Sequence, residues 1–300
     1  MVITRLLFLL LLPLAVARAD CRPVTHAMGT SCVSEAPQRV AVLDSGELDV
    51  LLSLGLQPVA ATTPNQAGQF PTYLRNQLAP TVDLGVPQEP DMERLAALKP
   101  DLILGSKLRH GRYYPILASI APTVLSEHIG ASWAENLHLF SLALNQEKQA
   151  KLWLQAFEQR CTRIRQLSRQ KQNPTVSVVR SMQSHIRLYL ADSFIGNVLE
   201  RCGLSRPTTQ QEAGFAIRLR SPATIHQLDG DIILLSEYAP ERGSLIRRWQ
   251  RSGFWTQLQA PIRNQLYRID DSWWMLGIGP TAALRILDDL EQILTAYDVD

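Results

Sequence analysis

The chain has 300 residues, of which 46% are hydrophobic and 19% are charged, a balance typical of a folded protein rather than a disordered one. This length fits one large domain or two of moderate size. The formal net charge of +2 is small and the basic residues are dispersed along the chain, so the composition gives no indication of a nucleic-acid-binding surface.

Residues 1–19 have the layout of a cleaved secretory signal, with Arg5 followed by an apolar run over residues 6–16. The run is shorter than the ~20 residues needed to cross a bilayer. We therefore expect export, with the mature chain beginning near Asp20. The residues before Cys21 do not resemble the Leu-x-small-Cys signal of a bacterial lipoprotein, which predicts a protein free in the periplasm rather than attached to lipid.

Export would place the four cysteines in a compartment that permits disulfides. Cys21 and Cys32 could close a short loop at the mature N-terminus. Cys161 and Cys202 each fall on the apolar side of a predicted helix, where they could pair or remain buried thiols. The sequence contains no Cys-x-x-Cys or His-x-x-x-His spacing, so it predicts no structural zinc site.

Residues 37–132 alternate short apolar runs with helix-period stretches, as a parallel sheet wrapped by helices requires. Helices are predicted after Ser45, ending at Gly55, and after Asp91, ending at Pro100. The predicted strands cover residues 40–43, 59–61, 82–84 and 102–104.

A long amphipathic helix is predicted over residues 146–170, within a helical segment over residues 133–172. Its single apolar face consists of Ala150, Trp153, Leu154, Phe157, Cys161 and Ile164. At ~1.5 Å per residue the helix would span roughly 37 Å, enough to run along two domains. It contains no Gly or Pro, so we expect a rigid connection and only slight movement between those domains.

Residues 173–300 form a second α/β half. Strands are predicted over residues 175–179 and 232–235, and helices over residues 195–202 and 281–293. Residues 92–104 and 222–234 share one plan, in which a capped helix, a turn and an Asp precede a buried strand. This internal echo favours two similar halves.

Several segments together resemble one family. They are Pro37 to Val40, Asp83 to Gly85, residues 92–104, residues 109–122, and Trp273 with residues 277–287. In order and spacing they resemble the periplasmic siderophore-binding proteins of ABC importers, the group that includes the ferric dicitrate, ferrichrome and vitamin B12 receptors. The resemblance implies two Rossmann-like lobes joined by a single long rigid helix, with the ligand in a shallow cleft between them. It further implies a monomer that delivers a ferric siderophore of the citrate or hydroxamate type to an ABC permease.

The chemistry of such a ligand decides which residues are candidates. The iron of a ferric siderophore is already coordinated, so the receptor needs no metal ligand or cofactor of its own. It needs guanidinium groups for the oxygens of the chelate and aromatic faces for its apolar edge. In open α/β lobes such groups lie beyond the carboxyl ends of the strands.

In the first lobe, Arg109 and Tyr114 match the segment that looks closest to the ferric dicitrate branch. Arg109 follows a strand closely, although it could be a solvated loop residue, and Tyr114 could be ordinary helix packing. In the second lobe Arg180 directly follows a predicted strand, with an ion pair as the alternative. Our hypothesis is that Arg109 and Arg180 hold the chelate from opposite lobes while Trp273 or Trp274 stacks on it.

Further candidates lie in the second lobe. Phe215, Arg218 and Arg220 lie in a predicted loop before a helix that is expected to begin near Ser221. This segment carries an aromatic ligand contact in the ferrichrome branch. Tyr238 follows a strand. Trp273 and Trp274 are expected in a loop after a strand predicted over residues 266–269, and one of the two is expected to fill the core of the lobe.

Docking on the permease is expected to use a surface glutamate in each lobe. Glu93 stands at that position in the first lobe. The second lobe has Ala223 there, so either Glu212 substitutes or docking is asymmetric.

Three other functions are alternatives to this one. An enzyme is unsupported, because no nucleophile elbow, phosphate loop or dinucleotide fingerprint follows a strand. A receptor for a bare transition-metal ion would need convergent ligands, and the spacing of His110, His128 and His185 implies no shared site. A heme or corrinoid receptor remains, with Tyr114 or Tyr238 as the axial ligand of a heme.

Overall fold

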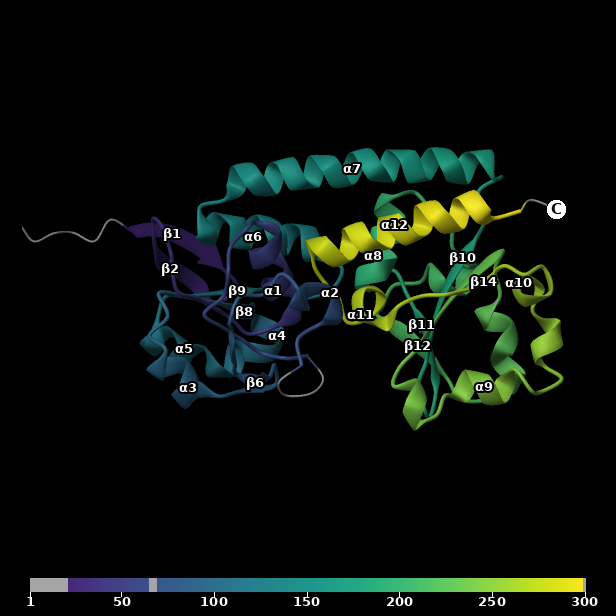
Figure 1. Cartoon of the computed structure of the whole chain (residues 1–300), viewed down its shortest axis with the longest axis horizontal. Coiled ribbons are helices and arrows are strands. Elements are labelled where there is room, and N and C mark those ends of the chain that lie inside the picture. The colour runs from purple at the N-terminus through teal and green to yellow at the C-terminus, as the bar shows by residue number, and fades with distance from the viewer. Residues whose placement is uncertain (1–20, 65–68, 299–300) are drawn as a thin grey trace, which may run out of the picture.

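The computed structural model describes residues 21–64 and 69–298, so the predicted secretory signal lies outside the described residues. Two five-stranded sheets occupy opposite ends of an elongated molecule (Figure 1). Among the described residues, no helix is long and apolar enough to cross a membrane.

The first sheet has the strand order β5-β4-β3-β8-β9, and all its strands are parallel. Its strands are β3 (Val40–Val42), β4 (Ala60–Ala61), β5 (Val82–Asp83), β8 (Leu102–Ser106) and β9 (Thr123–Ser126). The helices of this half are α1 (Ser45–Ser53), α2 (Thr72–Arg75), α3 (Met92–Ala97), α4 (Lys107–His110) and α5 (Tyr114–Ile120). Two small hairpins are added, β1 (Cys21–His26) with β2 (Gly29–Ser34) and β6 (Gly85–Val86) with β7 (Glu89–Pro90).

The second sheet has the order β12-β11-β10-β13-β14 and is mixed, because β11 runs antiparallel to both of its neighbours. Its strands are β10 (Val176–Ser181), β11 (Ile186–Tyr189), β12 (Ala216–Leu219), β13 (Ile232–Glu237) and β14 (Leu266–Arg268). The helices around it are α8 (Phe194–Arg201), α9 (Leu245–Trp249), α10 (Gln259–Ile262), α11 (Asp271–Trp274) and α12 (Pro280–Ala296). The helix predicted near Ser221 is a 3₁₀ helix over Pro222–Leu228.

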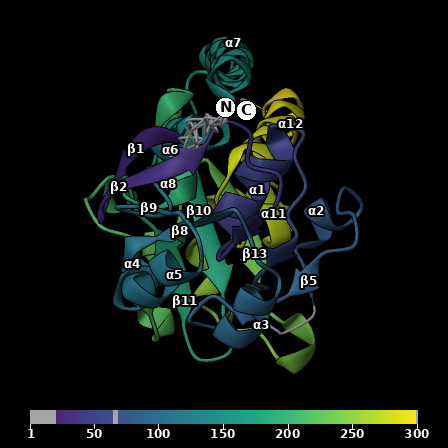
Figure 2. The same cartoon turned by 90° about the vertical axis from the view of Figure 1, so that its left-hand side faces the viewer.

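Two helices connect the halves in sequence, α6 (Trp133–Leu144) and α7 (Glu147–Gln170). Helix α7 runs along the top of both halves in Figure 1, with α12 beside it, and the end view in Figure 2 shows both helices above the sheets. Cys161 in α7 forms a disulfide with Cys202, which ends α8, and Cys21 forms one with Cys32 across the first hairpin.

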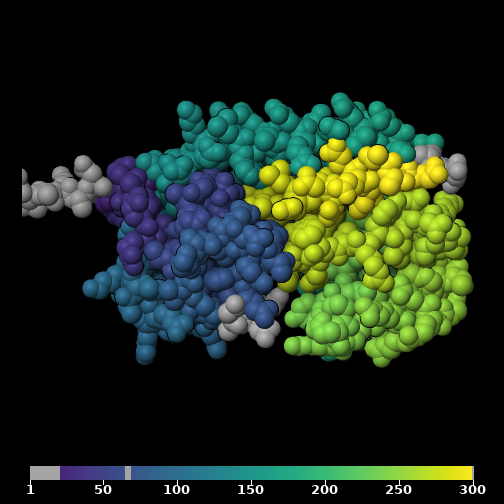
Figure 3. Space-filling view, in the orientation of Figure 1, coloured from purple at the N-terminus to yellow at the C-terminus, as the bar shows by residue number. Residues whose placement is uncertain are grey.

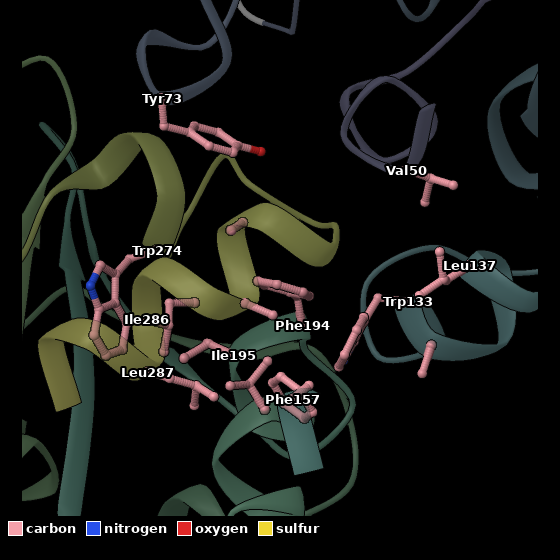
Figure 4. Close-up of a cluster of buried hydrophobic side chains, with 14 of the residues drawn as sticks. Val50, Tyr73, Trp133, Leu137, Phe157, Phe194, Ile195, Trp274, Ile286 and Leu287 are labelled. Atoms are coloured by element: carbon pink, nitrogen blue, oxygen red, sulfur yellow. The ribbon is translucent and has the colours of Figure 1, made fainter. Parts of the chain in front are cut away.

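The largest hydrophobic cluster does not stop at the boundary between the halves. It includes Val42 and Leu104 of the first sheet, Val178 and Leu234 of the second, and α12. At its centre Trp133 packs edge-on against Phe157, with ring centroids 4.9 Å apart (Figure 4). In the space-filling view the first half, in purple and blue, borders the yellow C-terminal segment directly (Figure 3).

A buried carboxylate also joins the halves. Asp49 in α1 accepts hydrogen bonds from the backbone N–H groups of Thr281 (2.7 Å) and Ala282 (3.1 Å), in the first turn of α12. The hydroxyl of Tyr73 donates a third bond (3.0 Å). A Cβ on Gly279 would lie 2.5 Å from that of Asp49, so only glycine allows this approach. Asp49 thereby supplies the cap that α12 lacks in its own half.

Candidate functional site

A cavity of about 610 Å³ opens between the two halves. The first half contributes the start of α1, the start of α4 and the segment after β9. The second half contributes β11, the start of α8, the segment before β12 and the segment after α11. The lining residues are mostly apolar, and they are Ser45, Pro64, Gln88, Leu108, Arg109, Ile129, Gly130, Tyr189, Asp192, Phe194, Ile195, Phe215, Trp274, Met275, Leu276, Gly277 and Ile278.

Arg109 reaches this cavity from α4, directly after β8. Its guanidinium forms an ion pair with Asp44, which is fully buried at the N-terminus of α1. Asp44 also accepts a hydrogen bond from the backbone N–H of Ser45 (2.7 Å). The side chain of Arg109 stays 28% exposed, so its remaining N–H donors can reach a ligand while Asp44 fixes its position.

A second buried carboxyl group lies close to this ion pair. Glu47 is only 2% exposed, and its Oε2 atom has no hydrogen-bond partner. Burial, together with the charge of Asp44, raises the pKa of Glu47 to about 8. The group is therefore protonated at neutral pH, and Asp44 alone carries the charge that pairs with Arg109.

Three arginines lie in a row across the second sheet. Arg180 in β10 is directly opposite Arg187 in β11, which is directly opposite Arg218 in β12. Residues opposite one another in neighbouring strands project from the same face of a sheet. The alternate positions in these strands, among them Val179, Ile186 and Leu188, are buried against α9.

The three arginines of the row differ in how many of their N–H donors are open to a ligand. Arg180 is buried and forms a two-pronged ion pair with Asp271, and its guanidinium lies over the ring of Tyr238 at 4.8 Å. Burial by itself would lower the pKa of Arg180, but the hydrogen bond and charge of Asp271 raise it. The ion pair that was the alternative in the sequence is thus present, and Arg180 lies inside its strand rather than after it.

Arg187 was not a candidate from the sequence. Its guanidinium lies 5.9 Å from the ring centre of Tyr189 and 5.7 Å from that of Phe215, two residues that line the cavity. Alternation of polar and apolar residues along β11 could have placed Arg187 on one face. The pairing of β11 with β10 and β12 decides that this face carries the other arginines.

The charges of the exposed arginines act on a nearby histidine. Burial and the charges of Arg187, Arg218 and Arg220 lower the pKa of His185. Arg218 and Arg220 are exposed, with Arg218 in β12 rather than in the predicted loop and Arg220 just beyond it. Anions are therefore attracted to the part of the second half that borders the cavity.

Of the aromatic candidates, Phe215 has the most accessible ring. It lines the cavity, is 56% exposed, and packs edge-on against Tyr189 with ring centroids 5.4 Å apart. Tyr238 lines a neighbouring hollow of about 420 Å³, which shares Pro64 and Leu276 with the cavity.

The two tryptophans lie in the short helix α11 rather than in a loop. Trp274 is 1% exposed, and its Nε1–H donates to Asp289 at 2.6 Å, so it fills the core at the cavity wall. Trp273 donates to the same carboxylate at 2.9 Å and borders a different hollow, beside α12. The structure does not place an open tryptophan face on the cavity.

Tyr114 lies away from the cavity, where its hydroxyl meets His26 of the first hairpin (3.4 Å). His110 is buried, with both ring nitrogens in hydrogen bonds to the backbone, to Ser106 N–H (3.1 Å) and Pro87 O (2.9 Å). Across the part of the chain that the structure describes, no group of three or more His, Cys, Asp or Glu residues could hold a metal ion. Glu93 is exposed at the start of α3.

Comparison with known proteins finds similar chains. The sequence profile of the family described as periplasmic binding protein matches residues 40–272. The chain is 33% identical to the "Probable siderophore-binding lipoprotein YfiY" of Bacillus subtilis, over 92% of this chain and 88% of that protein. It is 31% identical to the "Achromobactin-binding periplasmic protein" of Dickeya dadantii, over 86% of each.

Among solved structures, Staphylococcus aureus SirA complexed with staphyloferrin B superposes with a TM-score of 0.83 and 29% identity, over 91% of this chain and 98% of that one. The α/β fold with helices around parallel strands is thus that of siderophore-binding proteins.

One sequence prediction is wrong. We expected a protein free in the periplasm rather than attached to lipid, but the similar protein YfiY is named a lipoprotein. The prediction depended on the residues before Cys21, which lie outside the described residues.

The matched profile covers most of the chain, and the relatives match along nearly their whole length. This chain belongs to the periplasmic binding protein family, and the members to which it is similar include siderophore-binding proteins.

Proposed function

We propose that this protein captures an anionic ferric siderophore and delivers it to the permease of an ABC importer, without catalysis and without a cofactor of its own. The observation that carries the proposal is the row of arginines beside an apolar and aromatic cavity between the two halves. The relatives support it, because their names refer to siderophores and to achromobactin.

The division of labour follows from which donors are free. Arg180 and Arg109 already have carboxylate partners, so their main role is to shape the wall of the cleft. Only the N–H donors that these ion pairs leave unused are open to a ligand. Arg187, Arg218 and Arg220 have no carboxylate partner among the ion pairs of the described residues, and they offer guanidinium groups to the carboxylates of a citrate-type chelate. The two halves therefore hold the chelate unequally, with more unpaired positive charge in the second half.

The apolar part of the cavity suits the carbon framework of the chelate. Leu108 from the first half is 69% exposed and Phe215 from the second is 56% exposed, and both line the cavity. Exposed apolar side chains on the two walls of one cavity gain from covering a ligand that fits between them.

The two halves act as lobes, residues 37–132 and 173–300, with residues 133–172 as the segment between them. Helix α7, the shared core and the bond from Asp49 to α12 hold the lobes at a nearly fixed angle, so capture depends on a preformed cleft. We propose that the protein acts as a monomer and that Glu93 contacts the permease.

The experiment is a titration of the purified protein with the ferric complex of a citrate-type siderophore, such as staphyloferrin B, followed by intrinsic tryptophan fluorescence. Hemin, cyanocobalamin and zinc serve as competing ligands. We expect saturable quenching by the ferric chelate only. Tighter binding of hemin or zinc would contradict the proposal.

Single variants test the row. Arg187→Ala and Arg218→Ala should each weaken binding by about 1 to 3 kcal/mol, the usual loss for a charge-assisted hydrogen bond. Arg163→Ala removes an exposed arginine of α7 and is the matched control, for which we expect unchanged affinity. If both variants of the row bind as well as the control, the row does not bind the ligand.

A further inference from the structure

A second arginine-rich surface lies on the second half, apart from the cavity. A hollow of about 430 Å³ is lined by Gln183, Arg242, Gly243, Ser244, Arg247, Arg248 and Arg251. It lies beside α9, which is at the lower end of the second half in Figure 1, on the opposite side of the molecule from α7. Four of its seven lining residues are arginines in a chain whose formal net charge is only +2, so the charge is concentrated here.

The carboxylates near the hollow do not neutralise these arginines. Glu237 is bound by Arg247 at 2.8 Å and also by Arg268, so it is shared between two guanidinium groups. Burial by itself would raise the pKa of Glu237, but hydrogen bonds from Arg268 and Arg247 and the charge of Arg268 lower it, so Glu237 stays ionised and paired. Among the ion pairs of the described residues, Arg242 has one partner, its exposed neighbour Glu241 at 3.6 Å.

Two arginines of the hollow remain without a carboxylate. Within the described residues, no ion pair involves Arg248 or Arg251, and both side chains are exposed. Arg248 uses one nitrogen to donate to the backbone oxygen of Gln183 (3.0 Å), which holds it at the wall and leaves its other N–H donors free.

The wall of the hollow is preformed. The hydroxyl of Ser244 is hydrogen-bonded to that of Ser181 (2.9 Å), and Ser181 also accepts from the backbone N–H of Ile246 (3.0 Å). The side chain of Gln183 donates to the backbone oxygen of Arg242 (2.6 Å). Gly243 has a φ of 98°, a conformation that favours glycine, and no atom lies near its missing side chain, so the backbone there is open.

We propose that this hollow is a binding site for a phosphate group, separate from the siderophore cleft. Guanidinium groups are planar, always charged, and matched in geometry to the oxygens of phosphate. Arg248 and Arg251 supply the free donors, Arg247 and Arg242 add positive charge, and the hydrogen-bonded wall fixes the geometry before the anion arrives. The phosphate can belong to inorganic phosphate or to a phospholipid headgroup, since both present the same oxygens.

The test compares two double variants that lose the same charge. Arg248→Gln with Arg251→Gln removes the free donors of the hollow, and Arg163→Gln with Arg169→Gln removes two exposed arginines of α7. Binding of inorganic phosphate is measured by calorimetry at constant ionic strength. Binding to membranes is measured by sedimentation with phosphatidylglycerol vesicles and with phosphatidylcholine vesicles.

We expect the hollow variant to bind its phosphate source at least about tenfold more weakly than the wild type, and the α7 variant to bind as the wild type does. A loss seen with inorganic phosphate identifies a free-anion site, and a loss seen only with phosphatidylglycerol vesicles identifies a headgroup site. Both variants should keep their affinity for the ferric chelate, which separates this result from failure of the proposed function. Equal binding by the two variants, or no saturable binding of either source, overturns the proposal.

Discussion

Replacing Asp49 by Ala should destabilise the whole molecule, because this one carboxylate serves both halves. Its loss leaves the Tyr73 hydroxyl and two N–H groups of α12 without partners in a buried place. An unsatisfied buried group costs about 1 to 3 kcal/mol, and loss of a helix cap costs about 1 kcal/mol.

One effect works in the opposite direction. Burial raises the pKa of Asp49, although the hydrogen bonds from Thr281, Ala282 and Tyr73 lower it, so the folded protein bears a cost for holding this charge. The alanine variant is free of that cost. We therefore expect the net loss in the free energy of unfolding to lie near the lower end of the range that these contributions allow, at about 3 kcal/mol. For a chain of this size that corresponds to roughly 6 °C in Tm, at about 2 °C per kcal/mol.

The assay is thermal unfolding followed by circular dichroism, with Asp91→Ala as the matched control. Asp91 is also a helix cap, accepting from the backbone N–H of Arg94 (2.9 Å), but it is exposed and serves one half only. Its loss should cost about 1 kcal/mol. If Asp49→Ala costs no more than Asp91→Ala, the carboxylate does not join the halves as described.

Three further predictions follow from the same structure. The pKa of Glu47 is about 8 in the folded state, above the ordinary 4.5, so between these two values the folded state binds more protons than the unfolded chain. The stability that Glu47 contributes is therefore full below pH 4.5 and is lost as the pH rises through 8. Glu47→Gln should flatten this pH dependence by about 3 to 5 kcal/mol in urea unfolding from pH 5 to 9, and parallel curves for the two proteins would refute it. Replacing Cys161 and Cys202 together by Ala should lower the free energy of unfolding by about 4 kcal/mol, and replacing Cys21 and Cys32 together should lower it by about 3 kcal/mol. The reason is that the first pair closes a loop with a sequence separation of 41 and the second pair one of only 11. The reverse order of the losses in Tm would contradict this prediction. Phe215→Ala should weaken chelate binding about 2- to 10-fold with Tm unchanged. Trp273→Ala should lower Tm with the affinity for the chelate unchanged. Fluorescence titration of both variants decides which of the two residues contributes to binding.

Much of the α/β pattern could be read from local sequence. The predicted helix over residues 146–170 agrees with α7 to within one residue, because an apolar stripe at helical spacing and the absence of Gly and Pro depend on no other part of the chain. Asp91 caps α3, as the spacing of polar and apolar residues predicted. The strands that were predicted lie within a few residues of strands in the structure, because short buried runs bounded by Gly and Pro have few alternatives. Strands β9, β11 and β12 were not predicted.

The candidate site was predicted less completely. Arg109 and Phe215 line the cavity, and Arg218 joins the arginine row. Arg187 could not be found, because its importance arises from strand pairing with β10 and β12 rather than from its own neighbours in sequence. Trp273 was placed at the cleft on its position after a strand, yet a short helix turns it toward Asp289 instead.

The sequence by itself determined the periodicities, local caps such as Asp91 and the family, since these depend on residues close together in the chain or on their order along it. Only the tertiary structure decided which charges remain free. Asp44 pairs with Arg109 across 65 positions and Asp271 pairs with Arg180 across 91. Whether an arginine offers its donors to a ligand or spends them on a carboxylate depends on such distant partners, and no local pattern encodes them.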